Sequence, residues 1–209
     1  MDLRFAPISP NLERALRRAA VWHRDQVRKG SDTPYVQHVV GVAWMLDRLG
    51  YPEEVVIAGL LHDAVEDTSA TLADIEREFG RDVAEIVGHC TEVKRDPQGR
   101  QRPWIDRKRD HLAHLADAPI ATRAVVLADK LHNLISIEVD LLDGRDVWSR
   151  FNAGREEVLW YYRSMIERLG VGDPRLETLA QCCQEVMRRV AAISGAPAAE
   201  IGADRPQGH

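Results

Sequence analysis

Four ionisable residues interrupt an apolar segment in the first third of the chain. The stretch from Ala58 to Thr68 reads AGLLHDAVEDT, so one imidazole and three carboxylates fall among side chains suited to burial. Carboxylates are costly to bury without partners, and such a cluster calls for a cation or a hydrogen-bonding network. On a continuous helix Glu66 lies one turn beyond His62, and Asp67 lies one turn beyond Asp63. We therefore expect the four side chains to face one cavity.

Two more residues are candidate ligands for the same cation. His38 opens a predicted helix directly after a polar loop, and Asp129 interrupts the apolar run AVVLA at 124–128. A set of imidazole and carboxylate donors without a thiolate is typical of a divalent first-row metal in octahedral geometry. It favours manganese or iron over structural zinc.

These residues also match a known signature. His38, the dipeptide His62-Asp63 and Asp129 follow the H…HD…D pattern of the HD-domain phosphohydrolases. The segments RKGSDTPYVQH, GLLHDAVEDT, FGRDVAEIV and LADKLHNL resemble the hydrolase domain of the RelA/SpoT homologue family, above all its free-standing members, the small alarmone hydrolases. The HD dipeptide alone is a weak signal, but four segments in the family's order are specific. The resemblance covers about residues 12–170.

The resemblance implies an all-helical domain that hydrolyses the 3′-pyrophosphate of (p)ppGpp, giving GDP or GTP and pyrophosphate. It implies one Mn2+ ion held by four ligands: His38, His62, Asp63 and Asp129. It matches Glu66 and Asp67 to the family's catalytic pair, which orients and deprotonates the attacking water. The chain is thus expected to be a guanosine-3′,5′-bis(diphosphate) 3′-pyrophosphohydrolase-like enzyme.

Substrate-binding positions carry over in the same way. Arg28 and Lys29 match the pair that packs on the guanine base, and a planar cation is well suited to stack on a base. Three residues fall at positions associated with nucleotide binding: Tyr35, Lys94 and Asn133. A basic side chain near the pyrophosphate would offset its charge. Four candidates stay open for that role: Lys94, Lys130, Arg107 and Lys108.

Three departures from the family pattern bear on the substrate. Val39 stands where the family usually has proline, the segment after LHN reads LISI without the usual arginine, and the polar loop 95–102 is longer than in the small members. The metal set is intact, but the guanine assignment is weakened. The alternative is an HD phosphohydrolase acting on (p)ppApp or on another nucleotide or phosphoester. A non-catalytic nucleotide-binding module is a third hypothesis, although neither a lost ligand nor a broken Glu-Asp pair marks this sequence.

The elements that must position these residues are expected to be helices. Ser9-Pro10 starts a helix whose apolar stripe fades at Arg28-Lys29-Gly30, and 30–34 has the turn chemistry of a loop. Apolar periodicity predicts further helices over 36–49, 52–65, a short stretch ending near Phe79, 82–91, 104–115, 120–142, 147–169 and 175–194. No period-two alternation, internal repeat or linker occurs in the sequence. We predict an all-α, single-domain HD bundle over residues 1–194 and a disordered tail over 195–209.

Composition bounds the partners. The 209 residues are 44% hydrophobic and 29% charged with a net charge of −5, which argues against nucleic acid or a membrane surface as a partner and leaves a small nucleotide. No apolar run reaches the ~20 residues of a membrane span, and the first residues lack a signal-peptide pattern, so a cytoplasmic location is expected. Exposed faces of the last two helices leave an oligomer open. Five histidines outside the signature are expected to be structural: His23, His89, His111, His114 and His132.

Overall fold

The structure is a computed structural model, and it describes residues 8–151 and 153–195. The regular elements in these residues are helices. Within these residues no strand forms, and only two isolated bridges occur, Val27 with Pro34 and Arg95 with Gln101. The predicted all-α fold is confirmed. The elements in chain order are α1 (Pro10–Trp22), α2 (Val36–Arg48), α3 (Glu53–Leu61), α4 (Ala64–Asp67), α5 (Leu72–Phe79), α6 (Arg81–Cys90), α7 (Trp104–Ala116), α8 (Ile120–Leu142), the 3-10 turn η1 (Trp148–Arg150), α9 (Arg155–Leu169) and α10 (Pro174–Ile193).

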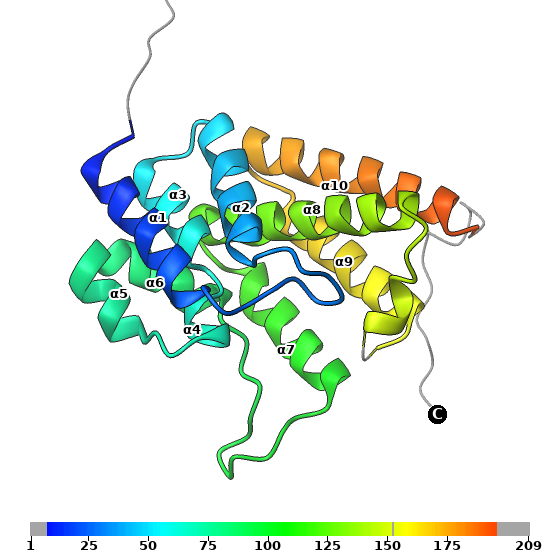
Figure 1. Cartoon of the computed structure of the whole chain (residues 1–209), viewed down its shortest axis with the longest axis horizontal. Helices are drawn as coiled ribbons and strands as arrows, with labels where there is room; N and C mark the ends of the chain where they lie inside the picture. The colour runs from blue at the N-terminus through cyan, green and yellow to red at the C-terminus, as the bar shows by residue number, and fades with distance from the viewer. Residues whose placement is uncertain (1–7, 152, 196–209) are drawn as a thin grey trace, which may run out of the picture.

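Helix α8 is the centre of the bundle. It runs side by side with α10 (Figure 1) and also contacts α2, α3, α6 and α9. Every residue from Ala124 to Asp129 is buried, as is every residue of α3 from Val55 to Leu61. A helix that is apolar on all faces is stable only when neighbours cover it on all sides. The candidate ligands therefore lie directly after one enclosed helix, α3, and within another, α8.

The helix that carries the HD dipeptide is not continuous, and that prediction is wrong. α3 ends at Leu61 and α4 begins at Ala64, so His62 and Asp63 form the turn between them. The Gly59 carbonyl, which a continuous helix would offer to the Asp63 amide, lies 2.9 Å from Nδ1 of His62. A side chain that takes a backbone acceptor in this way competes with the helical hydrogen bond. The imidazole thus ends the helix at the position where it enters the site.

Two other predicted helices are shorter than expected. α1 ends at Trp22, and Arg28 and Lys29 lie in a loop, because the Arg28 amide donates to the Thr33 carbonyl (2.8 Å) and the Tyr35 amide donates to the Gln26 carbonyl (2.8 Å). The predicted helix over 147–169 divides into η1 and α9. α9 begins only after Gly154, whose amide donates to the Glu157 carboxylate (3.0 Å).

The remaining helices lie within a few residues of their predicted bounds, and α8 is one uninterrupted helix. The predicted tail over 195–209 falls outside the described residues except for Gly195. None of the helices in 8–151 and 153–195 is both long and apolar enough to cross a bilayer.

The polar loop between α6 and α7 is anchored by one buried carboxylate. Glu92 accepts from Arg107 (2.7 Å) and from Lys108, and its own amide donates to Glu66 (3.1 Å). Burial alone would raise the pKa of Glu92, but Lys108 and Arg107 outweigh burial and hold that pKa below its usual range. Glu92 therefore ties the loop to α7 and to α4 as an ionised group.

We expect Glu92→Gln to lower the free energy of unfolding by about 3–5 kcal/mol at pH 7, because it leaves two half-buried cations without their carboxylate. A group whose pKa is lowered by folding stabilises the protein above its unfolded-state pKa of about 4.3, and that contribution is lost as the pH falls through the folded-state pKa. The gap between wild type and variant should therefore shrink below about pH 4.3. Urea unfolding of both proteins at pH 7 and in acid measures this difference in the free energy of unfolding. Glu85→Gln, which breaks an exposed pair with Arg81, is the control and should change little; an equal effect of both variants would contradict the anchor.

Candidate metal centre and nucleotide pocket

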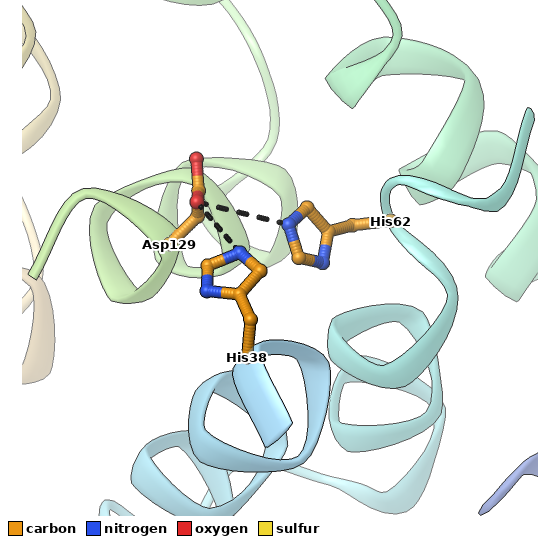
Figure 2. Close-up of side chains that lie close together, drawn as sticks. All are labelled: His38, His62 and Asp129. Carbon is orange, nitrogen blue, oxygen red and sulfur yellow. Dashed lines mark ion pairs between the residues drawn. The ribbon is translucent and has the colours of Figure 1, made fainter. Parts of the chain in front are cut away.

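Three buried side chains from three separate elements point at one another. His38 lies in the first turn of α2, His62 follows α3, and Asp129 lies in the middle of α8. Figure 2 shows both rings turned toward the Asp129 carboxylate. Oδ1 of Asp129 is 3.2 Å from Nε2 of His38 and 3.8 Å from Nε2 of His62. Ligand atoms of the three residues all lie within 4.8 Å of one another, close enough to hold one metal ion.

Asp63 joins this cluster from the turn after α3. Its Oδ2 lies 3.0 Å from Nε2 of His62 and 3.6 Å from Nε2 of His38. The Tyr35 hydroxyl donates to the same oxygen at 2.6 Å. The structure thus brings together all four residues that the sequence predicts as ligands.

The donor set fits a divalent cation. Nε2 of His38 and Nε2 of His62 are buried and have no hydrogen-bond partner within the described part of the chain, although carboxylate oxygens stand 3.0–3.8 Å away. Burial would raise the pKa of Asp129, but Lys130 and the two histidines hold it well below its usual range, so the carboxylate is ionised. Two imidazole nitrogens and two carboxylates around one point form the kind of mixed site that first-row divalent metals occupy.

Outer contacts fix the orientation of these ligands. Nδ1 of His62 lies 2.9 Å from the Gly59 carbonyl. Asp129 accepts from Asn133 and from Lys130, both at 2.5 Å. Such partners hold ligand side chains in register and tune their basicity. Nδ1 of His38 lies 2.9 Å from Nδ1 of His132, a contact that the sequence analysis missed, since no local pattern distinguishes a buried structural histidine from one beside a ligand.

Glu66 and Asp67 lie next to the cluster on α4. Lys94 reaches both carboxylates, at 2.8 Å from Glu66 and 3.3 Å from Asp67, and Gln26 donates to Asp67 at 3.2 Å. Glu66 lines a cavity of about 80 Å³ together with His62, Asp63 and Asp129. Of the two carboxylates, Glu66 is the one that faces the candidate metal ligands.

Two of the four candidate cations line the same small cavity. Lys108 and Lys130 line it, whereas Lys94 is held by Glu66 and Asp67, and Arg107 is held by Glu92. Lys108 and Lys130 are themselves paired, with Glu92 and Asp129 respectively. Both lie on the side of the cluster that Glu66 occupies.

A larger pocket of about 440 Å³ opens beside the cluster, between the loop that precedes α2 and the second half of α8. Its lining includes four of the five predicted substrate-binding residues: Arg28, Lys29, Tyr35 and Asn133. The Arg28 guanidinium donates to Asn133 (2.6 Å) and lies 5.6 Å from the centre of the Tyr35 ring. The fifth residue, Lys94, lies with Glu66 and Asp67 instead.

Arg150 of η1 is a pocket residue that the sequence analysis missed. It bonds to Asp140 at 2.6 Å and approaches the Lys29 carbonyl. Gly30 has a φ of +78°, and a Cβ at Gly30 would overlap the Arg150 side chain. The sequence predicts a continuous helix around Arg150. In the structure a turn there places this arginine in the pocket lining.

Comparison with known proteins identifies the family of the chain. A family model described as an HD domain matches residues 15–159. Drosophila melanogaster MESH1, a guanosine-3′,5′-bis(diphosphate) 3′-pyrophosphohydrolase, is 33% identical over 165 residues, which are 78% of this chain and 86% of that protein. The Xenopus tropicalis MESH1 is 40% identical over 119 residues, 56% of this chain and 63% of that protein. The GTP pyrophosphokinase of Streptomyces coelicolor is 32% identical over 166 residues, or 79% of this chain, but the match spans only 18% of that longer enzyme.

Solved structures point the same way. The structure of a metazoan orthologue of SpoT, described as hydrolysing ppGpp and acting in starvation responses, superposes with a TM-score of 0.73 at 30% identity and covers 88% of this chain and 98% of that one. The crystal structure of lmo0812 from Listeria monocytogenes superposes with a TM-score of 0.62 at 37% identity, covering 77% of this chain and 95% of that one. The chain belongs to the HD-domain family, and within it is related to MESH1 and the SpoT hydrolase domain as a small alarmone hydrolase-like protein.

Proposed function

We propose that this protein hydrolyses the 3′-pyrophosphate of (p)ppGpp to GDP or GTP and pyrophosphate. One divalent cation, Mn2+ in the first instance, would be held by four ligands: His38, His62, Asp63 and Asp129. The observation that carries the proposal is the position of this cluster between Glu66 on one side and the 440 Å³ pocket on the other, with Tyr35 and Asn133 both lining that pocket and bonding to ligand carboxylates. MESH1 proteins, to which this chain is similar, are named for the same reaction.

The chemistry assigns a role to each side of the cluster. A bound divalent cation supplies Lewis acidity, which offsets phosphate charge and makes a water easier to deprotonate. Glu66, supported by Asp67, takes a proton from the attacking water. The water oxygen bonds to the phosphorus attached to the 3′ oxygen, and the bond from that phosphorus to the 3′ oxygen breaks. The 3′ oxygen leaves as a hydroxyl after gaining a proton from solvent, and Glu66 returns its proton to solvent. Lys108 and Lys130, which line the cavity beside Glu66, offset the charge of the pyrophosphoryl group.

The nucleoside would occupy the larger pocket. Arg28 presents a planar cation there, next to the Tyr35 ring, and the Asn133 amide bridges Arg28 and Asp129. Asn133 therefore links the residue that holds the base to a residue that holds the metal. This link fixes the distance between the base and the reacting phosphorus.

One feature of the pocket favours (p)ppApp as a second candidate substrate. The wall formed by Ile135, Ser136 and Ile137 carries no charged side chain, and the nearby Asp140 carboxylate is engaged by Arg150 and Arg145. Guanine presents adjacent N1 and N2 donors that a free carboxylate pairs with best, whereas adenine presents only its N6 amino group as a donor. A direct comparison of ppGpp with ppApp as substrates therefore decides which base the pocket prefers.

The experiment incubates the protein with ppGpp, pppGpp, ppApp and a panel of nucleoside triphosphates, in parallel, in the presence of Mn2+. Release of pyrophosphate together with GDP or GTP supports the proposal, and a higher kcat/KM for ppApp moves the substrate to the adenine compound. Release of orthophosphate, or cleavage of triphosphates alone, would place the protein among HD phosphohydrolases of another kind.

Arg28→Ala is expected to raise KM for ppGpp by about tenfold to a hundredfold, because loss of a stacking partner for a base costs about 1–3 kcal/mol. The value of kcat should change much less, since Arg28 is neither a candidate metal ligand nor among the residues that line the cavity beside Glu66. Steady-state kinetics measure both constants. Arg24→Ala, an exposed arginine in the turn after α1, is the matched control with unchanged KM. A fall confined to kcat would contradict the base-binding role.

A further inference from the structure

His132 occupies an unusual place for a histidine outside the H…HD…D signature. It lies one turn after Asp129 on α8, is buried, and faces α2. Its Nδ1 is 2.9 Å from Nδ1 of His38, and the two rings meet edge to face with centroids 4.8 Å apart. The contact reaches the nitrogen of His38 that points away from the candidate metal.

Helix α2 makes room for this ring. A Cβ on Gly41 would overlap the Cδ2 and Nε2 atoms of His132, so only glycine at this position lets the ring lie where it does. Glycine inside a helix costs about 1 kcal/mol relative to alanine. In α2 the glycine stands at the position that faces His132. We therefore attribute the glycine to the space that the imidazole needs.

The hydrogen atoms of the pair follow from the geometry. Nε2 of His38 points at the Asp129 carboxylate, and a nitrogen that binds a cation must offer its lone pair. The proton of a neutral His38 ring then sits on Nδ1 and needs an acceptor, which is Nδ1 of His132. The proton of His132 then sits on Nε2. The Gln37 amide nitrogen is placed 3.3 Å from this atom, so the arrangement requires the Gln37 amide to be flipped to present its oxygen, since amide nitrogen and oxygen are assigned from the hydrogen-bond network.

The other ligand histidine shows the same arrangement with a different acceptor. Nδ1 of His62 lies beside the Gly59 carbonyl, so a backbone oxygen orients that ring. His38 depends on a side chain for the equivalent contact. A substitution of His132 can therefore remove the contact that orients His38, whereas no side-chain substitution removes the backbone carbonyl that orients His62.

We propose that His132 is a positioning residue for the metal centre: it accepts the Nδ1 hydrogen of His38 and so fixes the ring and tautomer that present Nε2 to the cation. The inference rests on the metal centre of the proposed function but not on its substrate. Loss of such an outer partner typically weakens metal binding by about tenfold to a hundredfold.

Two substitutions separate hydrogen bonding from packing. His132→Phe keeps a ring and removes the acceptor, whereas His132→Asn loses the ring but places an amide oxygen near the position of Nδ1. The dissociation constant for Mn2+ is measured by calorimetry without nucleotide, and circular dichroism with thermal unfolding checks the fold of each metal-free variant. We expect the constant to rise about tenfold to a hundredfold in His132→Phe and to stay near the wild-type value in His132→Asn. His114→Phe, an exposed imidazole on α7, is the control with unchanged affinity.

Gly41→Ala provides a test that leaves His132 intact. The added methyl group displaces the ring, and the dissociation constant should rise as in His132→Phe. If His132→Phe does not fold, Gly41→Ala and His132→Asn decide the question. Wild-type affinity in folded His132→Phe or Gly41→Ala, or a loss in His132→Asn as large as in His132→Phe, would overturn the role; so would a wild-type protein that binds no Mn2+. Since no nucleotide is present, the expected pattern of affinities would stand even if ppGpp proved not to be the substrate.

Discussion

Replacing Glu66 by glutamine is expected to lower kcat for ppGpp by about a hundredfold to ten-thousandfold, the range typical of a lost general base. The dissociation constant for Mn2+ should stay within a few fold of the wild-type value. Glu66 lines the cavity beside the candidate ligands, and it is bound by Lys94 and by the Glu92 amide rather than by the two histidines. Its carboxylate is thus placed to receive a proton without serving as a ligand.

The measurement combines steady-state kinetics with metal titration of the same preparation. Asp67→Asn should behave in the same direction with a smaller loss, because Asp67 does not line that cavity and is shared between Gln26 and Lys94. Glu76→Gln, on the neighbouring helix α5, serves as the control. A Glu66→Gln protein that folds but loses its Mn2+ would show that Glu66 is a ligand and that the base lies elsewhere.

Replacing Asp63 by alanine is expected to remove both the bound metal and the turnover. Its Oδ2 stands within 3.6 Å of both ligand nitrogens, so the substitution deletes one carboxylate of the cluster and leaves the Tyr35 hydroxyl without its acceptor. Asp63 is a cleaner choice than Asp129, because loss of Asp129 would also leave the half-buried Lys130 without its carboxylate and destabilise the fold.

Metal content after gel filtration and kcat after addition of Mn2+ are the two readouts. Asp82→Asn, at the exposed start of α6, controls for the loss of a carboxylate and should keep both. A folded Asp63→Ala protein that is metal-free yet fully active would show that the assigned metal site is not needed for the reaction.

Much of the site could be predicted from local sequence. His38, His62, Asp63 and Asp129 each stand out as ionisable groups at the edge of or inside apolar helices, and the structure brings all four together. The helices themselves follow from apolar periodicity, because each is stabilised by the face it buries. Both the apolar periodicity and the ionisable groups that interrupt it can be recognised within short stretches of the chain.

What the sequence analysis missed depends on contacts between distant residues. The break after α3 arises where His62 takes the Gly59 carbonyl while its ring enters a site built from α2 and α8. The loop that carries Arg28 is held by a bond to Asn133, 105 residues away. Arg150 reaches the pocket only because a turn interrupts the predicted helix before α9. Periodicity describes one element at a time, and none of these contacts lies within one element.

A Mn2+ titration of metal-free protein supplied with ppGpp tests whether this cluster is the hydrolytic centre. Turnover is expected to rise with added Mn2+ and to saturate near one equivalent per chain, with GDP and pyrophosphate formed in equal amounts. Folded protein that binds Mn2+ but leaves ppGpp intact, or that turns it over equally well without any metal, would contradict the assignment of this cluster as the hydrolytic centre.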